Sequence, residues 1–136
     1  MILRFTIPGD PRGKGRPRFD SRSRRAYTDS KTRAYERWVA ARAVGAMAAL
    51  GTWAELEGPV ELEVVAVKAR PVALGSGPRQ LAPVKPDANN IASAILDGLT
   101  KAGAWRDDAQ VCRLEAWTYY AASGEAPAVE VVVRSL

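Results

Sequence analysis

The side chains of this chain that are best suited to chemistry are acids gathered between positions 85 and 110. Asp87 stands in the run Lys85-Pro86-Asp87-Ala88-Asn89-Asn90, and Asp107 and Asp108 follow Trp105-Arg106. The chain contains no histidine, which excludes serine or cysteine catalysis through a histidine base and excludes imidazole metal ligands. If the protein is an enzyme, carboxylates, lysines, tyrosines or a metal-bound water must carry its chemistry.

A helix is predicted between these acids, over residues 89–102. Its apolar stripe is Ile91, Ile95, Leu96 and Leu99, and Gly103 favours its end. Asp87 and Asp108 therefore flank the helix, and they can meet only if the following strand runs back beside the helix start.

Each acid also has a structural interpretation. Asp87 and Asn89 are favoured helix caps, and Asp107 with Asp108 fits a turn between helix and strand. Asp97, inside the helix, is more typical of a surface or structural acid than of a ligand.

The charge of the chain is unevenly distributed. Residues 1–42 carry twelve basic and four acidic side chains, a net +8, whereas the whole chain carries only +5. Most of these cations are arginine, whose planar group of donors matches phosphate oxygens. The pattern favours a nucleic-acid partner; the alternative is a solvated, arginine-rich surface.

The remaining patterns predict an α+β fold. A strand over 2–7 is followed by a basic loop over 8–26 and a helix that begins after Asp29 or Ser30 and ends at Gly51. A strand over 59–69, a long and mobile loop over 70–86, the helix over 89–102, and an antiparallel pair over 109–121 and 127–134 complete the order. This order, β-α-β-loop-α-β-β, predicts a small mixed or antiparallel sheet with two main helices, in one domain over residues 1–136.

Two further features limit the class of protein. The single cysteine, Cys112, has no internal disulfide partner. No apolar run reaches the ~20 residues that span a bilayer, and no signal-peptide pattern is present. We therefore expect a cytoplasmic protein without a membrane partner.

The motifs of this chain resemble those of the RusA-type crossover-junction endodeoxyribonucleases, which phages and prophages often encode. The N-terminal match is Gly9-x-Pro11-x-Gly13-Lys14-Gly15-Arg16-Pro17-Arg18, followed by Tyr27-Thr28 and Lys31-Thr32-Arg33-x-Tyr35. The C-terminal match is Lys85-Pro86-Asp87-x-Asn89-Asn90, Ile95-Leu96-Asp97-Gly98-Leu99 and Gly103-x-Trp105-x-Asp107-Asp108-x-Gln110-Val111.

The resemblance implies a homodimer that cuts four-way (Holliday) junctions by paired symmetric nicks in recombination and repair, with Mg²⁺ or Mn²⁺. Asp87 and Asp108 match the first and last catalytic acids of the family. Asn89 stands where the family has a second acid, and Ser93 where it has a lysine. The implied metal ligands are Asp87, Asn89, Asp107 and Asp108. Glu61 and Glu63, on the preceding strand, are expected to be solvated; the alternative is that one of them replaces the missing acid.

The basic residues assigned to DNA binding on the same basis are Lys14, Arg16, Arg18, Arg22, Arg24, Arg25, Lys31, Arg33 and Lys85. Because two catalytic positions depart from the family pattern, a non-cleaving or weakly active junction-binding protein of the same fold is the main alternative. A basic nucleic-acid-binding protein unrelated to junctions is a third.

Overall fold

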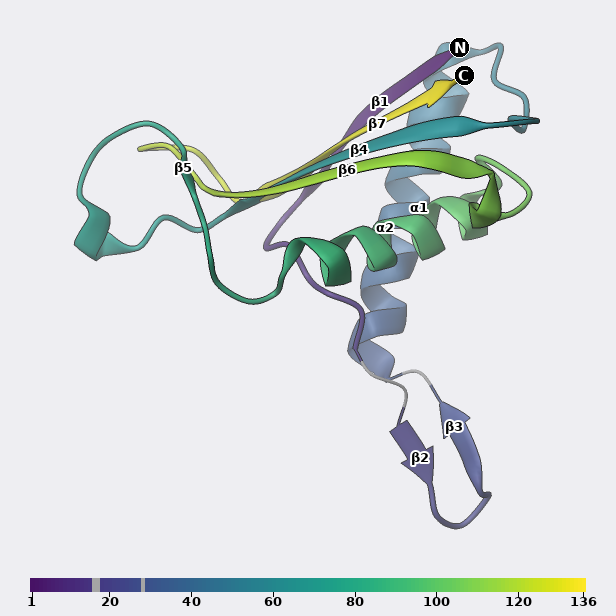
Figure 1. The fold of residues 1–136 in the computed structure, drawn as a ribbon, viewed down its shortest axis with the longest axis horizontal. Coiled ribbons are helices and arrows are strands. Elements are labelled where there is room, and N and C mark those ends of the chain that lie inside the picture. The colour runs from purple at the N-terminus through teal and green to yellow at the C-terminus, as the bar shows by residue number, and fades with distance from the viewer. Residues whose placement is uncertain (16–17, 28) are drawn as a thin grey trace.

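A five-stranded mixed sheet carries two helices on one face, and a separate two-stranded sheet projects from the body as an arm (Figure 1). The computed structural model describes residues 1–15, 18–27 and 29–136. Its elements are β1 (Ile2–Pro8), β2 (Arg18–Asp20), β3 (Arg25–Tyr27), α1 (Ser30–Leu50), β4 (Val60–Lys68), the 3-10 helix η1 (Val72–Leu74), β5 (Gln80–Leu81), α2 (Ala88–Ala102), the 3-10 helix η2 (Asp108–Gln110), β6 (Val111–Tyr120) and β7 (Ala128–Ser135). The predicted α+β class is confirmed.

The main sheet has the strand order β1-β7-β4-β6-β5. The predicted pairing of the last two strands with each other is wrong, because β4 lies between them: β6 runs parallel to β4 on one side, and β7 runs antiparallel to it on the other. Parallel pairing requires a crossover connection, and α2 lies in the connection from β4 to β6. The mostly buried β4 is thereby paired along both edges.

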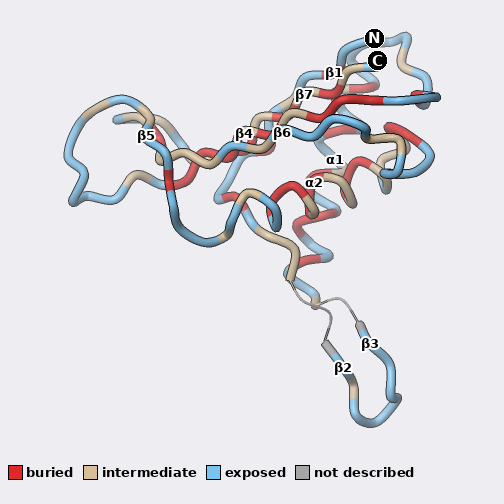
Figure 2. The backbone as a smooth tube through the Cα atoms, in the orientation of Figure 1, coloured by how far each residue is buried: buried red, intermediate tan, exposed pale blue. Residues whose placement is uncertain are grey.

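The core lies between the sheet and the helices (Figure 2). Val60, Leu62, Val64 and Ala66 are buried on one face of β4, as their alternation predicts, and they join one cluster with residues of both helices. The helices approach closely at Gly98 of α2, where an added Cβ would lie 2.5 Å from Cγ1 of Val39 on α1. Among the described residues, neither helix has the length and apolar character needed to cross a bilayer.

Three of the predicted helix ends are confirmed, whereas α2 begins one residue before the predicted Asn89, because Asp87 is its cap. Asp29 caps α1 by accepting from the backbone N–H groups of Lys31 and Thr32. Gly51 and Gly103 follow the two helices with φ values of 70° and 77°, a left-handed conformation that glycine adopts without a Cβ clash.

Two predicted loops contain regular structure. The basic segment 8–26 includes β2 and most of β3, which are too short for their periodicity to be recognised. The segment 70–86 contains η1 and β5, and Arg70 donates hydrogen bonds to the carbonyls of Gly75, Pro78 and Ala121. The latter segment is therefore an organised connection; its mobility stays a prediction.

Candidate active site

An acidic cavity of about 520 Å³ lies beside the C-terminal half of α2. Asp97 on the helix, Asp107 and Asp108 after it, and Lys14 from the N-terminal loop line this cavity. Glu36, Thr100, Lys101 and Arg106 complete its wall. The structure thus brings predicted site residues from both motifs together, and it adds Asp97.

Lys14 reaches the acidic cavity because its loop lies directly against α2. The backbone N–H of Lys14 donates to the Asn90 carbonyl at 3.1 Å, and its Nζ lies 2.7 Å from Oδ2 of Asp97. The hydrogen bond to Asp97 raises the pKa of Lys14 above its ordinary value despite partial burial. Lys14 is therefore charged at neutral pH and positioned by two contacts.

The two glycines beside Lys14 permit this approach. A Cβ at Gly13 would lie 2.9 Å from Cβ of Asn90, and one at Gly15 would lie 2.4 Å from Oδ2 of Asp29. The Gly15 backbone N–H also donates to Oγ1 of Thr32 at 2.9 Å. The Gly-Lys-Gly sequence thus fits between the starts of the two helices, a spatial role that the motif alone did not reveal.

Asp108 lines the acidic cavity, and the pKa of its carboxyl group is raised above the ordinary value. Burial raises the pKa of Asp108, Asp107 and Asp97 raise it further, and the charge of Lys14 opposes the shift. Its neighbour Asp107 has a structural role, since it caps η2 by accepting from Ala109 while the Gln110 side chain accepts from the Asp107 N–H. Asp108 is therefore the better candidate for a chemical role.

Asp87 lies at the opposite end of α2. It caps the helix, with Oδ1 accepting from the Asn90 N–H at 2.8 Å, whereas Asp108 follows the helix C-terminus. At about 1.5 Å per residue, α2 separates its two ends by roughly 20 Å. β6 does run back toward the helix start, but Asp108 precedes that strand, so one chain does not bring Asp87 and Asp108 together.

The two departing positions lie near Asp87. Asn89 is in the first turn of α2, and Ser93, one turn later, donates its hydroxyl to the Asn89 carbonyl at 3.0 Å. Neither residue lines the acidic cavity. Within the described part of the chain, no three histidine, cysteine or acidic side chains are grouped closely enough to hold a metal ion.

A buried lysine holds the segment that leads to Asp87. Lys68, at the end of β4, donates to the carbonyls of Val84 and Pro86, the latter at 2.7 Å. Burial lowers the pKa of Lys68, and the charge of Asp87 opposes that shift. Sequence reasoning missed this residue; a lysine that ends an apolar strand was its only signal.

Glu61 and Glu63 do not complete the site. They alternate with the core residues of β4 and so lie on the sheet face away from α2. Glu61 is paired with Arg113 at 3.5 Å, and Glu63 with Arg134 at 2.8 Å. These pairings argue against the alternative in which one of them replaces the missing acid, and the expectation that both are solvated is wrong for Glu61, which is buried.

Most of the predicted DNA-binding cations are exposed. Arg22, Arg24 and Arg25 lie at the end of the arm formed by β2 and β3, Lys31 and Arg33 lie in the first turn of α1, and Lys85 precedes Asp87. Arg16 and the side chain of Arg18 are outside the described residues.

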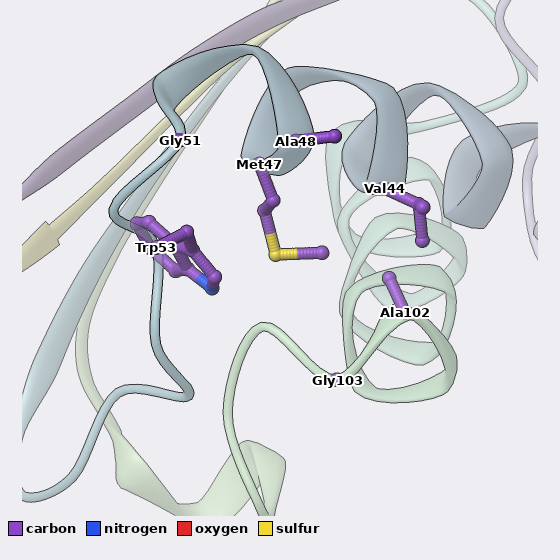
Figure 3. A pocket seen from close by; sticks show the side chains of 7 residues that line it. All are labelled: Val44, Met47, Ala48, Gly51, Trp53, Ala102 and Gly103. Carbon is purple, nitrogen blue, oxygen red and sulfur yellow. The ribbon is translucent and has the colours of Figure 1, made fainter.

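A second hollow lies at the C-terminal ends of the helices (Figure 3). It is lined by Val44, Met47, Ala48, Gly51, Trp53, Ala102 and Gly103. None of these side chains has an acidic or basic group, so this hollow is unsuited to acid–base chemistry. The acidic cavity and the start of α2 remain the candidate sites.

The family model for endodeoxyribonuclease RusA matches residues 8–134, which include both motifs and the acidic cavity. The chain belongs to the RusA endodeoxyribonuclease family. RusA nucleases bind branched DNA, work as dimers and generally depend on divalent metal. The chain is also 27% identical over 145 residues to the uncharacterized protein YqaN of Bacillus subtilis (strain 168), over 98% of this chain and 96% of the relative.

Proposed function

We propose that this protein is a metal-dependent endonuclease that resolves four-way DNA junctions by paired symmetric nicks. The observation that carries the proposal is the RusA family match over residues 8–134. The motif acids Asp87 and Asp108 agree with this function, and so do the exposed cations of the N-terminal segment. The proposed catalytic residues are Asp87 and Asp108, with Asn89 and Ser93 at the two altered positions.

The separation of Asp87 from Asp108 has a consequence for assembly. If both acids serve one metal ion, they must come from different subunits. A two-fold axis that sets two α2 helices antiparallel would place Asp87 of one subunit beside Asp108 of the other, and would form two such sites. Two equivalent sites are what paired nicks on a two-fold symmetric junction require.

The side-chain atoms at the proposed site are oxygens, the ligand type that a hard divalent cation prefers. Mg²⁺ prefers oxygen ligands and retains several waters, and Asp87, Asp108 and the Asn89 side chain all offer oxygens. When bound, the ion would activate water and balance charge on the scissile phosphate. Within one chain the described donors are too dispersed to hold it, which agrees with a site shared between subunits.

Incubation with an end-labelled four-way junction in Mg²⁺ or Mn²⁺, followed by a denaturing gel, tests the activity. We expect paired symmetric nicks from the unaltered chain and none from Asp87→Asn or Asp108→Asn, although both variants should still bind the junction. A bound but uncut junction would instead support the alternative of a non-cleaving binder, which the altered positions Asn89 and Ser93 favour.

Mixing the two inactive variants tests the shared site. A heterodimer of Asp87→Asn with Asp108→Asn has one intact shared site, so nicking on one strand should return. If each site were built from one chain, no site in the mixture would be intact and no nicking would return. Asp87→Asn alone, at the same total concentration, is the control.

A further inference from the structure

The arm formed by β2 and β3 has a composition that packing does not explain. It is a two-stranded sheet separate from the main sheet, it projects past the N-terminal end of α1 (Figure 1), and its residues from Ser21 to Ala26 are all exposed. An isolated two-stranded hairpin is marginally stable in water. A large apolar side chain here adds nothing to the core.

Phe19 is such a side chain. It lies in β2 with 66% of its surface exposed, and its partner across the arm is Ala26, which is itself exposed. No ring–ring contact involves Phe19 among the described residues. Its aromatic faces are therefore accessible to a flat ligand.

The surroundings of Phe19 are positively charged. Asp20 holds the turn of the arm by accepting from the Arg22 N–H at 2.9 Å and from Oγ of Ser23 at 3.0 Å, and these bonds lower its pKa. Within the described part of the chain, no ion pair involves Arg22, Arg24 or Arg25. The arm thus combines one accessible aromatic ring with three cations suited to phosphate.

We propose that Phe19 stacks on an unpaired or unstacked DNA base at the branch point while the arm arginines contact the flanking phosphates. Aromatic stacking on bases is independent of sequence, and removing a base from its stack costs least where pairing is already disturbed. Phe19 would therefore favour branched DNA over continuous duplex, whereas the arginines would attract both. This inference rests on the proposed function and assigns to one residue the discrimination between the two forms of DNA.

The affinities of the full chain for a four-way junction and for a continuous duplex of matching sequence test the proposal. They are measured by fluorescence anisotropy at fixed salt in EDTA. Phe19→Ala should weaken junction binding about 5- to 100-fold, the range that base–aromatic stacking supplies, and change duplex binding less than about twofold. Phe19→Trp should restore junction binding. The matched control is Leu81→Ala on β5, which removes an apolar side chain of similar exposure, 61%, and should leave both affinities unchanged.

A second readout reports on the base itself. A junction with 2-aminopurine at the branch point should change its emission when the unaltered chain binds, and this change should disappear with Phe19→Ala at saturating protein. An equal weakening on junction and duplex, or an unchanged ratio of the two affinities, would overturn the proposal. A shift from dimer to monomer mass in light scattering would also overturn it, since Phe19 would then be a subunit contact. If the unaltered chain does not prefer the junction, the proposed function itself fails.

Discussion

Lys14 and Asp97 join the basic N-terminal segment to the acidic helix, with Nζ of Lys14 2.7 Å from Oδ2 of Asp97. The backbone of the same lysine is bonded to Asn90, seven positions earlier, so Lys14 follows α2 for about two turns. One cation from the DNA-binding motif is thereby placed among the carboxyl groups of the acidic cavity, where it opposes the raised pKa of Asp108.

Replacing Lys14 by methionine should affect activity far more than stability. Both side chains of the pair are partly exposed, 39% and 29%, so the decrease in unfolding free energy should stay below about 1 kcal/mol. The pKa of Asp108 should rise further, and nicking should fall at least about tenfold, which is only about 1.4 kcal/mol of barrier. Urea unfolding and the pH profile of nicking measure the two effects. Asp97→Asn is the matched control, because it breaks the same ion pair but keeps the Lys14 cation. Unchanged nicking by Lys14→Met would show that this cation has no part in the reaction.

Restoring the family residues at positions 89 and 93 should raise activity. Asn89→Asp adds a carboxylate two residues after Asp87, which should lower the Mg²⁺ concentration needed for half-maximal nicking severalfold. Ser93→Lys adds a cation one turn later on the same helix face, within reach of the same phosphate. The double variant should exceed both single ones, because the two charges act at one site. Full Mg²⁺-dependent nicking by the unaltered chain, with no gain from Asn89→Asp, would mean that another acid completes the site.

Two helical glycines should respond oppositely to alanine. At Gly98 an added Cβ would lie 2.5 Å from Val39, so Gly98→Ala should destabilise the protein by about 1–3 kcal/mol through overpacking. At Gly45 on α1 an added Cβ would have no described neighbour within 4 Å apart from the adjacent residues and the backbone of its own helix, so Gly45→Ala should stabilise the protein by roughly 0.5–1 kcal/mol. Thermal unfolding measures both. Equal effects would contradict the close approach of the helices at Gly98.

The stability should depend on Glu125 at acidic pH. Hydrogen bonds from Arg79 and from the Ala122 N–H lower the pKa of Glu125 from 4.5 to about 2. A lowered carboxyl pKa adds stability above pH 4.5 that disappears as the pH falls toward 2. The stability difference between the unaltered chain and Glu125→Gln should therefore shrink across this window, as measured by urea unfolding. A difference that is constant with pH would contradict the role of ionisation.

The arm arginines should set the salt dependence of DNA binding. Replacing Arg22, Arg24 and Arg25 by alanine should reduce the slope of log affinity against log salt by about 0.9 for each phosphate that the protein no longer neutralises. The decrease should be similar on junction and duplex, unlike that of Phe19→Ala. Arg113→Ala is the control, because Arg113 is paired with Glu61 on the far face of the sheet. An unchanged slope in the triple variant would exclude the arm from the DNA interface.

Local patterns determined the helices of this protein. The caps Asp29 and Gly51 were predicted because each satisfies backbone groups within a few residues of itself. The alternation of Val60, Leu62, Val64 and Ala66 likewise identified the buried face of β4, since a strand alternates its side chains between two faces. The motif from Asp87 to Asp108 identified the family because its residue types and spacing belong to the sequence itself.

Only the tertiary structure decided which distant segments lie together. Local sequence carries no signal for the insertion of β7 between β1 and β4, since strand order depends on long-range pairing. The arm escaped prediction because strands of three residues show no periodicity. The contact of Lys14 with Asp97 and the separation of Asp87 from Asp108 follow from how the loop and β6 pack around α2. The sequence specifies which charged residues are present and how far apart they lie along the chain. The distances between them in space depend on the buried core, because the core positions α2.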